Sequence, residues 1–319
     1  MKRYFCTLFD KNYLIKGLTM IKSLKNHCDE FEIKVLCLDE KTKEILESIN
    51  IREINCISLK EVETEDLLIL KKERSTAEYC WTLASTFTWY VLQNNDEIDL
   101  ITYLDADLFF YSNVEPIFEE IGNSSIAIIE HRFAPEFQYL ETNGKFCVEW
   151  NSFRRDSEGI TCLDTWRKQC LEWCYYKNEK GRMGDQKYLD EWPYKYKSCH
   201  IIKNLGAGIA PWNYSQYQIS VNNNSIRINN KNLIFYHFHQ FQILENNKFF
   251  RLGEIYSFNR EEPFPIYEFY EKQLLVAIDN IREIDDNFNY GILKSNRSIR
   301  EKIKYYLPLK IKKIIRRFI

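Results

Sequence analysis

The sequence lacks several features that would place the protein in a specialised class. Its ten cysteines form no Cys-X-X-Cys pair, and they are too dilute and irregular for a disulfide scaffold, which argues against both a zinc site and a disulfide-rich fold. No apolar run approaches the length of a membrane span, and the N-terminal segment MKRYFCTLFD has no long apolar stretch of the kind found in signal peptides. We therefore expect a cytoplasmic protein whose thiols are free.

An excess of one charge is also missing. The 44 Lys and Arg residues nearly balance the 46 Asp and Glu residues, and the net charge of −2 argues against nucleic acid as a main partner. We find no internal repeats, and no glycine-rich, basic phosphate loop follows the first apolar segment. What remains is an ordinary globular composition of 319 residues, 45% hydrophobic and 28% charged, with ample material for a core.

Alternating strands and helices open the chain. Apolar runs at residues 4–9, 33–38 and 54–57 predict strands, and helical spacing of apolar residues predicts helices at 13–24 and 41–48. This order is typical of βαβ units and predicts an α/β fold with a mostly parallel sheet. We predict further helices at 77–92, 114–121, 163–176, 183–192 and 263–284, strands at 125–130, 147–153 and 200–203, and a hairpin of 226–228 with 233–238. Residues 60–75 are charged and ambiguous.

The rest of the chain is organised around the segment LITYLDADLFFYSN at residues 100–113. An apolar run, typical of a strand buried on both faces, stops at Asp105 and Asp107, and a second apolar run follows at once. Two carboxylates beside so much apolar surface are costly unless a positive charge meets them. Because Mg²⁺ and Mn²⁺ prefer carboxylate oxygens, the pattern favours a divalent-cation site over a simple Asx turn.

Two other segments fit the same ligand site. The turn Asp10-Lys11-Asn12-Tyr13 ends the first predicted strand, where Asp10 would accept a hydrogen bond from a base or ribose and Tyr13 would stack on a ring. His237 ends a late predicted strand and would complete the metal shell with an imidazole. A lone histidine is more often structural, but the segment HFH holds two of only five histidines.

Longer segments carry a resemblance to a known family. They are FCTLFDKNY, EYCWTL, YLDADLFF, EWNSFRRD, EWCYYKNEKGRMGDQKYLDEWP, GAGIAPWN and FYHFHQF. Over residues 3 to about 240 the chain resembles nucleotide-sugar-dependent glycosyltransferases of the GT-A (Rossmann-like) fold, and it is most similar to family 8-like bacterial enzymes of surface-polysaccharide synthesis. The long segment around GDQKYLDEWP is far more specific than the Asp-X-Asp motif.

The resemblance implies a set of site residues. Asp105, Asp107 and His237 would bind Mn²⁺ or Mg²⁺. The nucleotide-binding residues would be Thr7, Asp10, Tyr13 and Asp105, and the catalytic residues would be Asp185 and Gln186. The sugar and acceptor side would be lined by His131, Arg132, Cys147, Glu149 and Trp212. The implied reaction moves a hexose from a nucleotide-diphosphate sugar, with UDP the expected nucleotide and the anomeric configuration retained, to a glycan or lipid-linked acceptor.

The chain departs from the family pattern at three places. Cys147-Val148-Glu149 stands where similar proteins have Asn-Val-Gly, and Gln240 stands where a glycine is usual. The basic donor-binding residue expected in the helix before the Asp-X-Asp motif has no match in EYCWTL. Arg74, Arg132 and Lys16 are each able to replace it, and the sequence does not choose among them.

The C-terminal part differs in character from the rest. We expect a glycosyltransferase domain at residues 1–250, a helical extension at 251–294 and a basic amphipathic tail at 295–319. The tail has the pattern of a helix that lies on an anionic membrane surface, although a packed C-terminal helix explains it equally well. Two other functions stay open: a nucleotidyltransferase acting on sugar phosphates, and a catalytically inactive carbohydrate-binding protein at a membrane.

Overall fold

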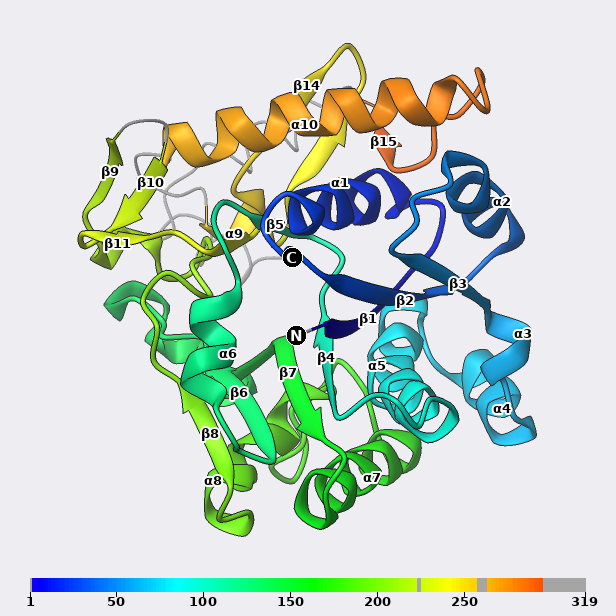
Figure 1. The fold of residues 1–319 in the computed structure, drawn as a ribbon, viewed down its shortest axis with the longest axis vertical. Coiled ribbons are helices and arrows are strands. Elements are labelled where there is room, and N and C mark those ends of the chain that lie inside the picture. Colours follow the sequence, from blue (N-terminus) through cyan, green and yellow to red (C-terminus); the bar gives the residue numbers. More distant parts are fainter. Residues whose placement is uncertain (1, 223–224, 257–262, 295–319) are drawn as a thin grey trace, which may run out of the picture.

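The computed structural model describes residues 2–222, 225–256 and 263–294. Its centre is a seven-stranded, mostly parallel sheet in the order β3-β2-β1-β4-β7-β6-β8, and helices flank it (Figure 1). One hydrophobic cluster packs α1, α2, α6 and α10 on one face, and a second packs α3, α4, α5 and α7 on the other. The predicted α/β class with a mostly parallel sheet is confirmed.

The first part of the sheet follows the predicted βαβ order. β1 (Arg3–Phe9), β2 (Phe31–Cys37) and β3 (Ile54–Ser58) pair in parallel, with α1 (Leu14–Lys25) and α2 (Glu40–Ile49) between them. Asp39 caps α2 by accepting a hydrogen bond from the backbone N–H of Thr42. Because each strand is joined to its neighbour by a short helical crossover, local sequence periodicity is enough to predict this part.

Two short helices occupy the ambiguous charged segment. They are α3 (Leu59–Val62) and α4 (Glu65–Glu73), and the long helix α5 (Thr76–Asn94) follows. Ser58 and Ser75 each open a capping box with a glutamate three residues later, which fixes where α3 and α5 begin. α5 then leads into β4 (Leu100–Leu104), which pairs in parallel with β1.

The sheet becomes mixed beyond β4. β7 (Phe146–Arg154) runs antiparallel between β4 and β6 (Ile126–Glu130), and β8 (Cys199–Ile202) lies parallel to β6 at the edge. The connections contain α6 (Glu115–Ile121), η1 (Pro135–Asn143), α7 (Ser157–Glu172), η2 (Gln186–Glu191) and α8 (Trp192–Lys195).

Two helix predictions need correction in this region. α7 begins six residues before the predicted start at 163, because Asp156 caps it by accepting from the backbone N–H groups of Glu158 and Gly159. The predicted helix at 183–192 is mainly the short 3-10 helix η2.

The predicted hairpin of 226–228 with 233–238 is correct in its first strand but not in its second, because the chain turns back at Asn229-Asn230 and the returning strand is residues 231–232. β10 (Ser225–Ile228) pairs instead with β9 (Ile219–Asn222) and β11 (Lys231–Asn232). The chain then leaves this small sheet, and β12 (Phe235–His237) pairs antiparallel with β5 (Leu108–Phe110), the strand that follows Asp107. Phe235 stacks on Trp150 of the core, with ring centroids 5.6 Å apart, which favours this longer-range pairing.

The last described segments lie along α1. β13 (Gln242–Leu244), β14 (Lys248–Phe250) and β15 (Ile292–Leu293) form a small sheet, and α9 (Gly253–Tyr256) and α10 (Phe264–Arg282) lie between β14 and β15 in the chain. α10 runs over α1 (Figure 1), where Lys22 donates to Asn280.

The domain limits at 250 and 294 stay a prediction, and the predicted tail at 295–319 lies outside the described residues. Among the described helices, none has the length and apolar character needed to cross a membrane.

Candidate active site

Two strand pairings bring the Asp-X-Asp motif and His237 together. β4 ends at Leu104, and the chain turns through Asp105 and Asp107 before β5 begins. In the pairing of β5 with β12, His237 lies opposite Leu108, the residue after Asp107. The backbone N–H of Phe238 also donates to the Asp107 carbonyl at 2.8 Å. The backbone therefore fixes the imidazole beside both carboxylates.

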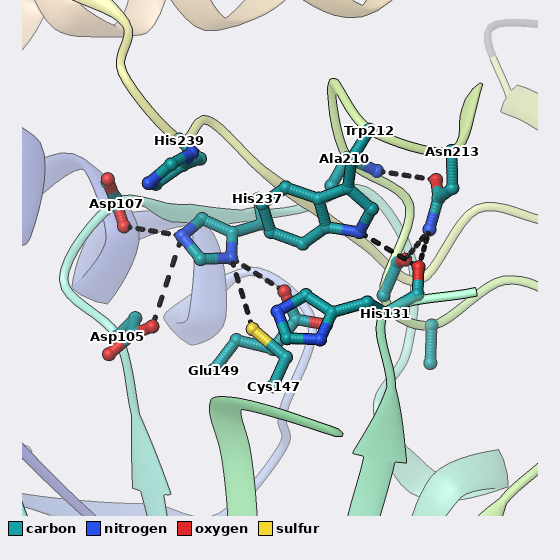
Figure 2. A network of polar contacts seen from close by, with 12 residues as sticks. Asp105, Asp107, His131, Cys147, Glu149, Ala210, Trp212, Asn213, His237 and His239 are labelled. Atoms are coloured by element: carbon teal, nitrogen blue, oxygen red, sulfur yellow. Dashed lines mark hydrogen bonds and ion pairs between the residues drawn. The ribbon is translucent and has the colours of Figure 1, made fainter. Parts of the chain in front are cut away.

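The two ring nitrogens of His237 face different partners (Figure 2). Nε2 lies 3.0 Å from Asp107 Oδ1 and 3.9 Å from Asp105 Oδ2. Nδ1 lies 2.6 Å from Glu149 Oε2 and 4.0 Å from the Cys147 thiol. The Trp212 ring meets the imidazole edge-on with centroids 5.2 Å apart and helps to fix its orientation. The ring thus has one side that faces the Asp-X-Asp motif and another that faces β7.

The site holds more negative charge than the described positive groups balance. Loss of contact with water, together with Asp107 and Glu149, raises the pKa of Asp105 to about 7, although His237 opposes the shift. Burial would raise the pKa of Asp107, but the neighbouring His237 and Lys16 hold it well below its usual range. Burial is the largest cause of the raised pKa of Asp105, and the nearby carboxylates of Asp107 and Glu149 add to it, so a cation at this place would stabilise the ionised form.

Nε2 of His237 lies near one oxygen of each aspartate, at 3.0 Å for Asp107 and 3.9 Å for Asp105. Ligands at about 2.1 Å from one ion in an octahedral shell lie about 3 Å apart. The ligand atoms of Asp105, Cys147 and His237 also lie within 4.8 Å of one another. The thiol, however, lies by Nδ1, and one imidazole cannot direct both nitrogens at the same ion. Two carboxylates and an imidazole suit Mn²⁺ or Mg²⁺.

Asp185 lies at the start of η2 and is buried. Gly184 before it has a φ of +54°, and the Asp185 carbonyl accepts from the Trp166 indole N–H at 3.0 Å. Burial, and then the charge of Asp105, raise the pKa of Asp185 to about 8. The charges of both Asp105 and Asp185 act on Tyr103 and raise its pKa further, in addition to the effect of burial. The structure therefore brings Asp185 into electrostatic contact with the Asp-X-Asp motif.

The predicted nucleotide-binding residues lie at the end of β1, but not all are accessible. The Asp10 carboxylate accepts from the backbone N–H of Asn12 at 2.9 Å and of Tyr13 at 3.2 Å, so it shapes the turn. Tyr13 is 43% exposed, and the Lys16 ammonium lies 4.4 Å from the centre of its ring. Thr7 is fully buried within β1, and its hydroxyl has no hydrogen-bond partner among the described residues.

Several residues predicted on the sugar and acceptor side have structural contacts. The His131 ring stacks on Phe133 at 4.6 Å, and its carbonyl accepts from Trp212 Nε1 at 2.9 Å. Arg132 donates to the carbonyl groups of Ala207 and Asn204. The Gln186 amide donates to the Asn143 carbonyl at 3.0 Å. These contacts do not test a role in sugar binding, which stays a prediction.

Sequence reasoning gave His239 no place in the site and did not detect how Glu149 is used. His239 lies beside Asp107 (Figure 2), and its Nδ1 is 3.2 Å from the Tyr256 hydroxyl. Burial, and then the charge of His237, lower the pKa of His239 to about 4. Glu149 is fully buried against His237. The substitution of Glu149 for a glycine in the family pattern was the only sequence signal for this contact.

Comparisons with known proteins show the family and the fold of the chain. Residues 6–159 match the model of "Glycosyl transferase family 8", a range that includes Asp105 and Asp107. The uncharacterised proteins YfnD and YfnF of Bacillus subtilis (strain 168) are each 32% identical to the chain, over 91% of it and over 94% and 97% of their own lengths. The glycosyltransferase GlyE of Streptococcus pneumoniae TIGR4 shares the fold with a TM-score of 0.53 at 13% identity, over 91% of this chain and 65% of that one. The chain therefore belongs to the same family as these two Bacillus proteins and is a family 8-like glycosyltransferase of the GT-A fold.

Proposed function

We propose that the protein is a metal-dependent hexosyltransferase that uses a nucleotide-diphosphate sugar, with UDP as the expected nucleotide, and retains the anomeric configuration. The acceptor would be a glycan or a lipid-linked sugar in surface-polysaccharide synthesis. The observation that carries the proposal is the cluster of Asp105, Asp107 and His237 at the ends of β4 and β12, where negative charge is in excess. A divalent cation would balance this charge.

Each group has a distinct task in this proposal. Asp105, Asp107 and the Nε2 atom of His237 hold the ion. Tyr13 stacks on the nucleoside base, and Asp10 accepts a hydrogen bond from the base or ribose. When bound, the ion neutralises negative charge on the departing nucleotide diphosphate. Thr7 is buried, so its part would be to shape the floor beneath the nucleoside.

Asp185 is the proposed catalytic residue, with Gln186 beside it. Asp185 orients the acceptor hydroxyl or stabilises the oxocarbenium-like centre, so no stable covalent intermediate is required. Its electrostatic contact with Asp105 is consistent with a position near the reacting carbon. The sugar pocket would be shaped by residues that hold neighbouring segments in place, on the side of His237 away from the Asp-X-Asp motif. They are His131, Arg132, Cys147 and Trp212.

Glu149 has a more specific task than sugar contact. Its Oε2 lies 2.6 Å from His237 Nδ1, and the side chain is fully buried. A carboxylate that accepts the Nδ1 proton leaves Nε2 free to face the ion and makes the imidazole a stronger ligand. Glu149 would therefore be a positioning residue for the metal site.

A panel of nucleotide sugars tests the proposal. UDP-, GDP-, ADP- and dTDP-hexoses would be incubated with the protein and Mn²⁺, and release of free nucleoside diphosphate would be measured with and without EDTA. We expect slow hydrolysis of one nucleotide class that stops when the metal is removed. Equal release with EDTA, or no release from any donor and no donor binding, would contradict the proposal.

Location at the inner face of the membrane is a further part of the proposal. An acceptor on a lipid carrier requires a cytoplasmic enzyme to stay near that surface, and the basic tail at 295–319 has a suitable sequence. Deleting residues 309–319 should release the protein from anionic vesicles at low salt while donor hydrolysis continues. A full-length protein that stays in the supernatant with such vesicles would refute this part.

A further inference from the structure

The first turn of α1 contains no acidic residue, and the nearest carboxylate in the chain, that of Asp10, accepts from the backbone N–H groups of Asn12 and Tyr13, which precede the helix. Tyr13 is the N-cap residue and makes no side-chain cap, and the first turn contains no Asp or Glu. The backbone N–H groups of a first helical turn are unpaired within the helix and carry a partial positive charge. α1 follows β1 directly and packs against β5, the strand after Asp107. The charges of Asp107 and Asp105 both act on Tyr13, so the N-terminal end of this helix is near the proposed metal site.

Lys16, in this first turn, is a second and independent sign of an anionic ligand. Its side chain is only 8% exposed, and its Nζ lies 4.4 Å from the centre of the Tyr13 ring. Among the described residues, the ammonium has no hydrogen bond or ion pair with a protein group. The Asp107 carboxylate is close enough to raise the pKa of Lys16, but burial has the larger effect and lowers it. An ammonium at the end of a largely buried side chain, with no protein partner, has its hydrogen-bond donors available to an anionic ligand.

The other two basic candidates are already used by the fold. Arg74 donates to the carbonyl groups of Cys170 and Leu171 at 2.7 and 2.8 Å, at the end of α7. Arg132 donates to the carbonyl groups of Asn204 and Ala207. Each would have to give up these bonds to meet a ligand, whereas Lys16 would not.

We propose that Lys16 and the backbone N–H groups at the start of α1 bind the phosphate oxygens of the nucleotide diphosphate. This inference rests on the proposed function, because it assumes a nucleotide-diphosphate donor beside Tyr13. An ammonium offers three donors to phosphate oxygens, and the first turn of a helix adds N–H groups that point the same way. Asp105, Asp107 and His237 would hold the ion that neutralises charge on the diphosphate, and Lys16 would donate hydrogen bonds to its phosphate oxygens.

Titration calorimetry with three ligands tests this inference. The nucleoside diphosphate that the wild-type protein binds best, the monophosphate of the same base and the free nucleoside would be titrated with Mn²⁺ present. Lys16→Met removes the charge and keeps a side chain of similar length, Lys16→Arg keeps the charge, and Lys22→Met is the control on the same helix, because Lys22 is paired with Asn280. Thermal unfolding without ligand would accompany each titration.

A charge-assisted hydrogen bond to phosphate predicts a clear pattern. Lys16→Met should weaken diphosphate binding about tenfold to a hundredfold and leave nucleoside binding unchanged. Lys16→Arg should restore most of the loss, and Lys22→Met should bind like the wild type. Because Lys16 has no protein partner to lose, Lys16→Met should not lower the unfolding temperature.

Three results would overturn the inference. One is unchanged diphosphate affinity in Lys16→Met, which would leave the proposed function intact. Another is an equal loss for the free nucleoside, which would make Lys16 a support for the Tyr13 ring. The third is that no nucleoside diphosphate binds the wild-type protein, in which case the proposed donor class falls together with the role of Lys16.

Discussion

The two sides of the candidate site have opposite charge. The acidic cluster is formed by Asp105, Asp107 and Glu149, which surround the imidazole of His237, and by Asp185, which feels the charge of Asp105. The α1 side, formed by Tyr13, the first helical turn and Lys16, offers N–H groups and one ammonium. Both belong to one fold, yet the first attracts cations and the second attracts anions.

This difference indicates how each side is completed. The acidic cluster repels a diphosphate unless a cation is present, because like charges in a poorly hydrated site repel strongly. The α1 side accepts phosphate oxygens without any ion. Changes in the acidic cluster should therefore alter metal dependence and turnover, whereas changes at Lys16 should alter only the part of donor affinity that comes from the phosphates.

The largest effect is expected from the Asp-X-Asp motif. Asp105→Asn or Asp107→Asn should reduce transfer about a thousandfold or more, because the ion that stabilises the leaving group is lost. Folding should be retained, and Asp105→Asn relieves repulsion among the carboxylates. Transfer rates at saturating Mn²⁺ and unfolding temperatures would be measured, with the exposed Asp96→Asn as control. Near-normal transfer in either variant would show that the pair has no part in catalysis.

A smaller effect is expected from Asp185. Asp185→Asn should lower turnover about a hundredfold while donor affinity changes little, since the residue acts at the reacting carbon and not on the nucleotide. Turnover from steady-state kinetics and donor affinity from calorimetry separate the two. A large loss of donor affinity would move Asp185 from catalysis to donor binding.

The smallest effect should come from the Nδ1 side of His237. Glu149→Met should weaken Mn²⁺ binding about tenfold to a hundredfold, and Glu149→Gln should weaken it less because the amide still accepts a hydrogen bond. Mn²⁺ affinity measured by calorimetry is the readout. Cys147→Ser should keep the wild-type affinity, since the thiol lies away from Nε2. If Cys147→Ser loses more affinity than Glu149→Met, the thiol is a ligand and the ion lies on the other side of the ring.

The parts of the fold that depend on local pattern were predictable from the sequence. The strands and helices of residues 3–58 follow short-range periodicity, and the break in apolar character at Asp105 marked the end of β4. The position of His237 at the end of a strand was also predicted, because the apolar run stops there.

The parts that depend on long-range pairing were not predictable. An apolar strand such as β12 fits several partners equally well, and only the packed core selects β5 over the nearby β10. The same holds for Glu149, whose partner comes from a strand 88 residues away. Arg74 shows the converse: its charge suggested a ligand contact, but backbone carbonyl groups at the end of α7 bind it instead.

Binding of Mn²⁺, followed by electron paramagnetic resonance, tests the central claim most directly. The wild-type protein should remove the free-ion signal with one site per chain. His237→Ala should weaken that site strongly, and His239→Ala, whose imidazole is bonded to Tyr256, should weaken it less. If the wild-type protein binds no Mn²⁺, or if His239→Ala has the larger effect, then the acidic cluster around His237 is not the metal site.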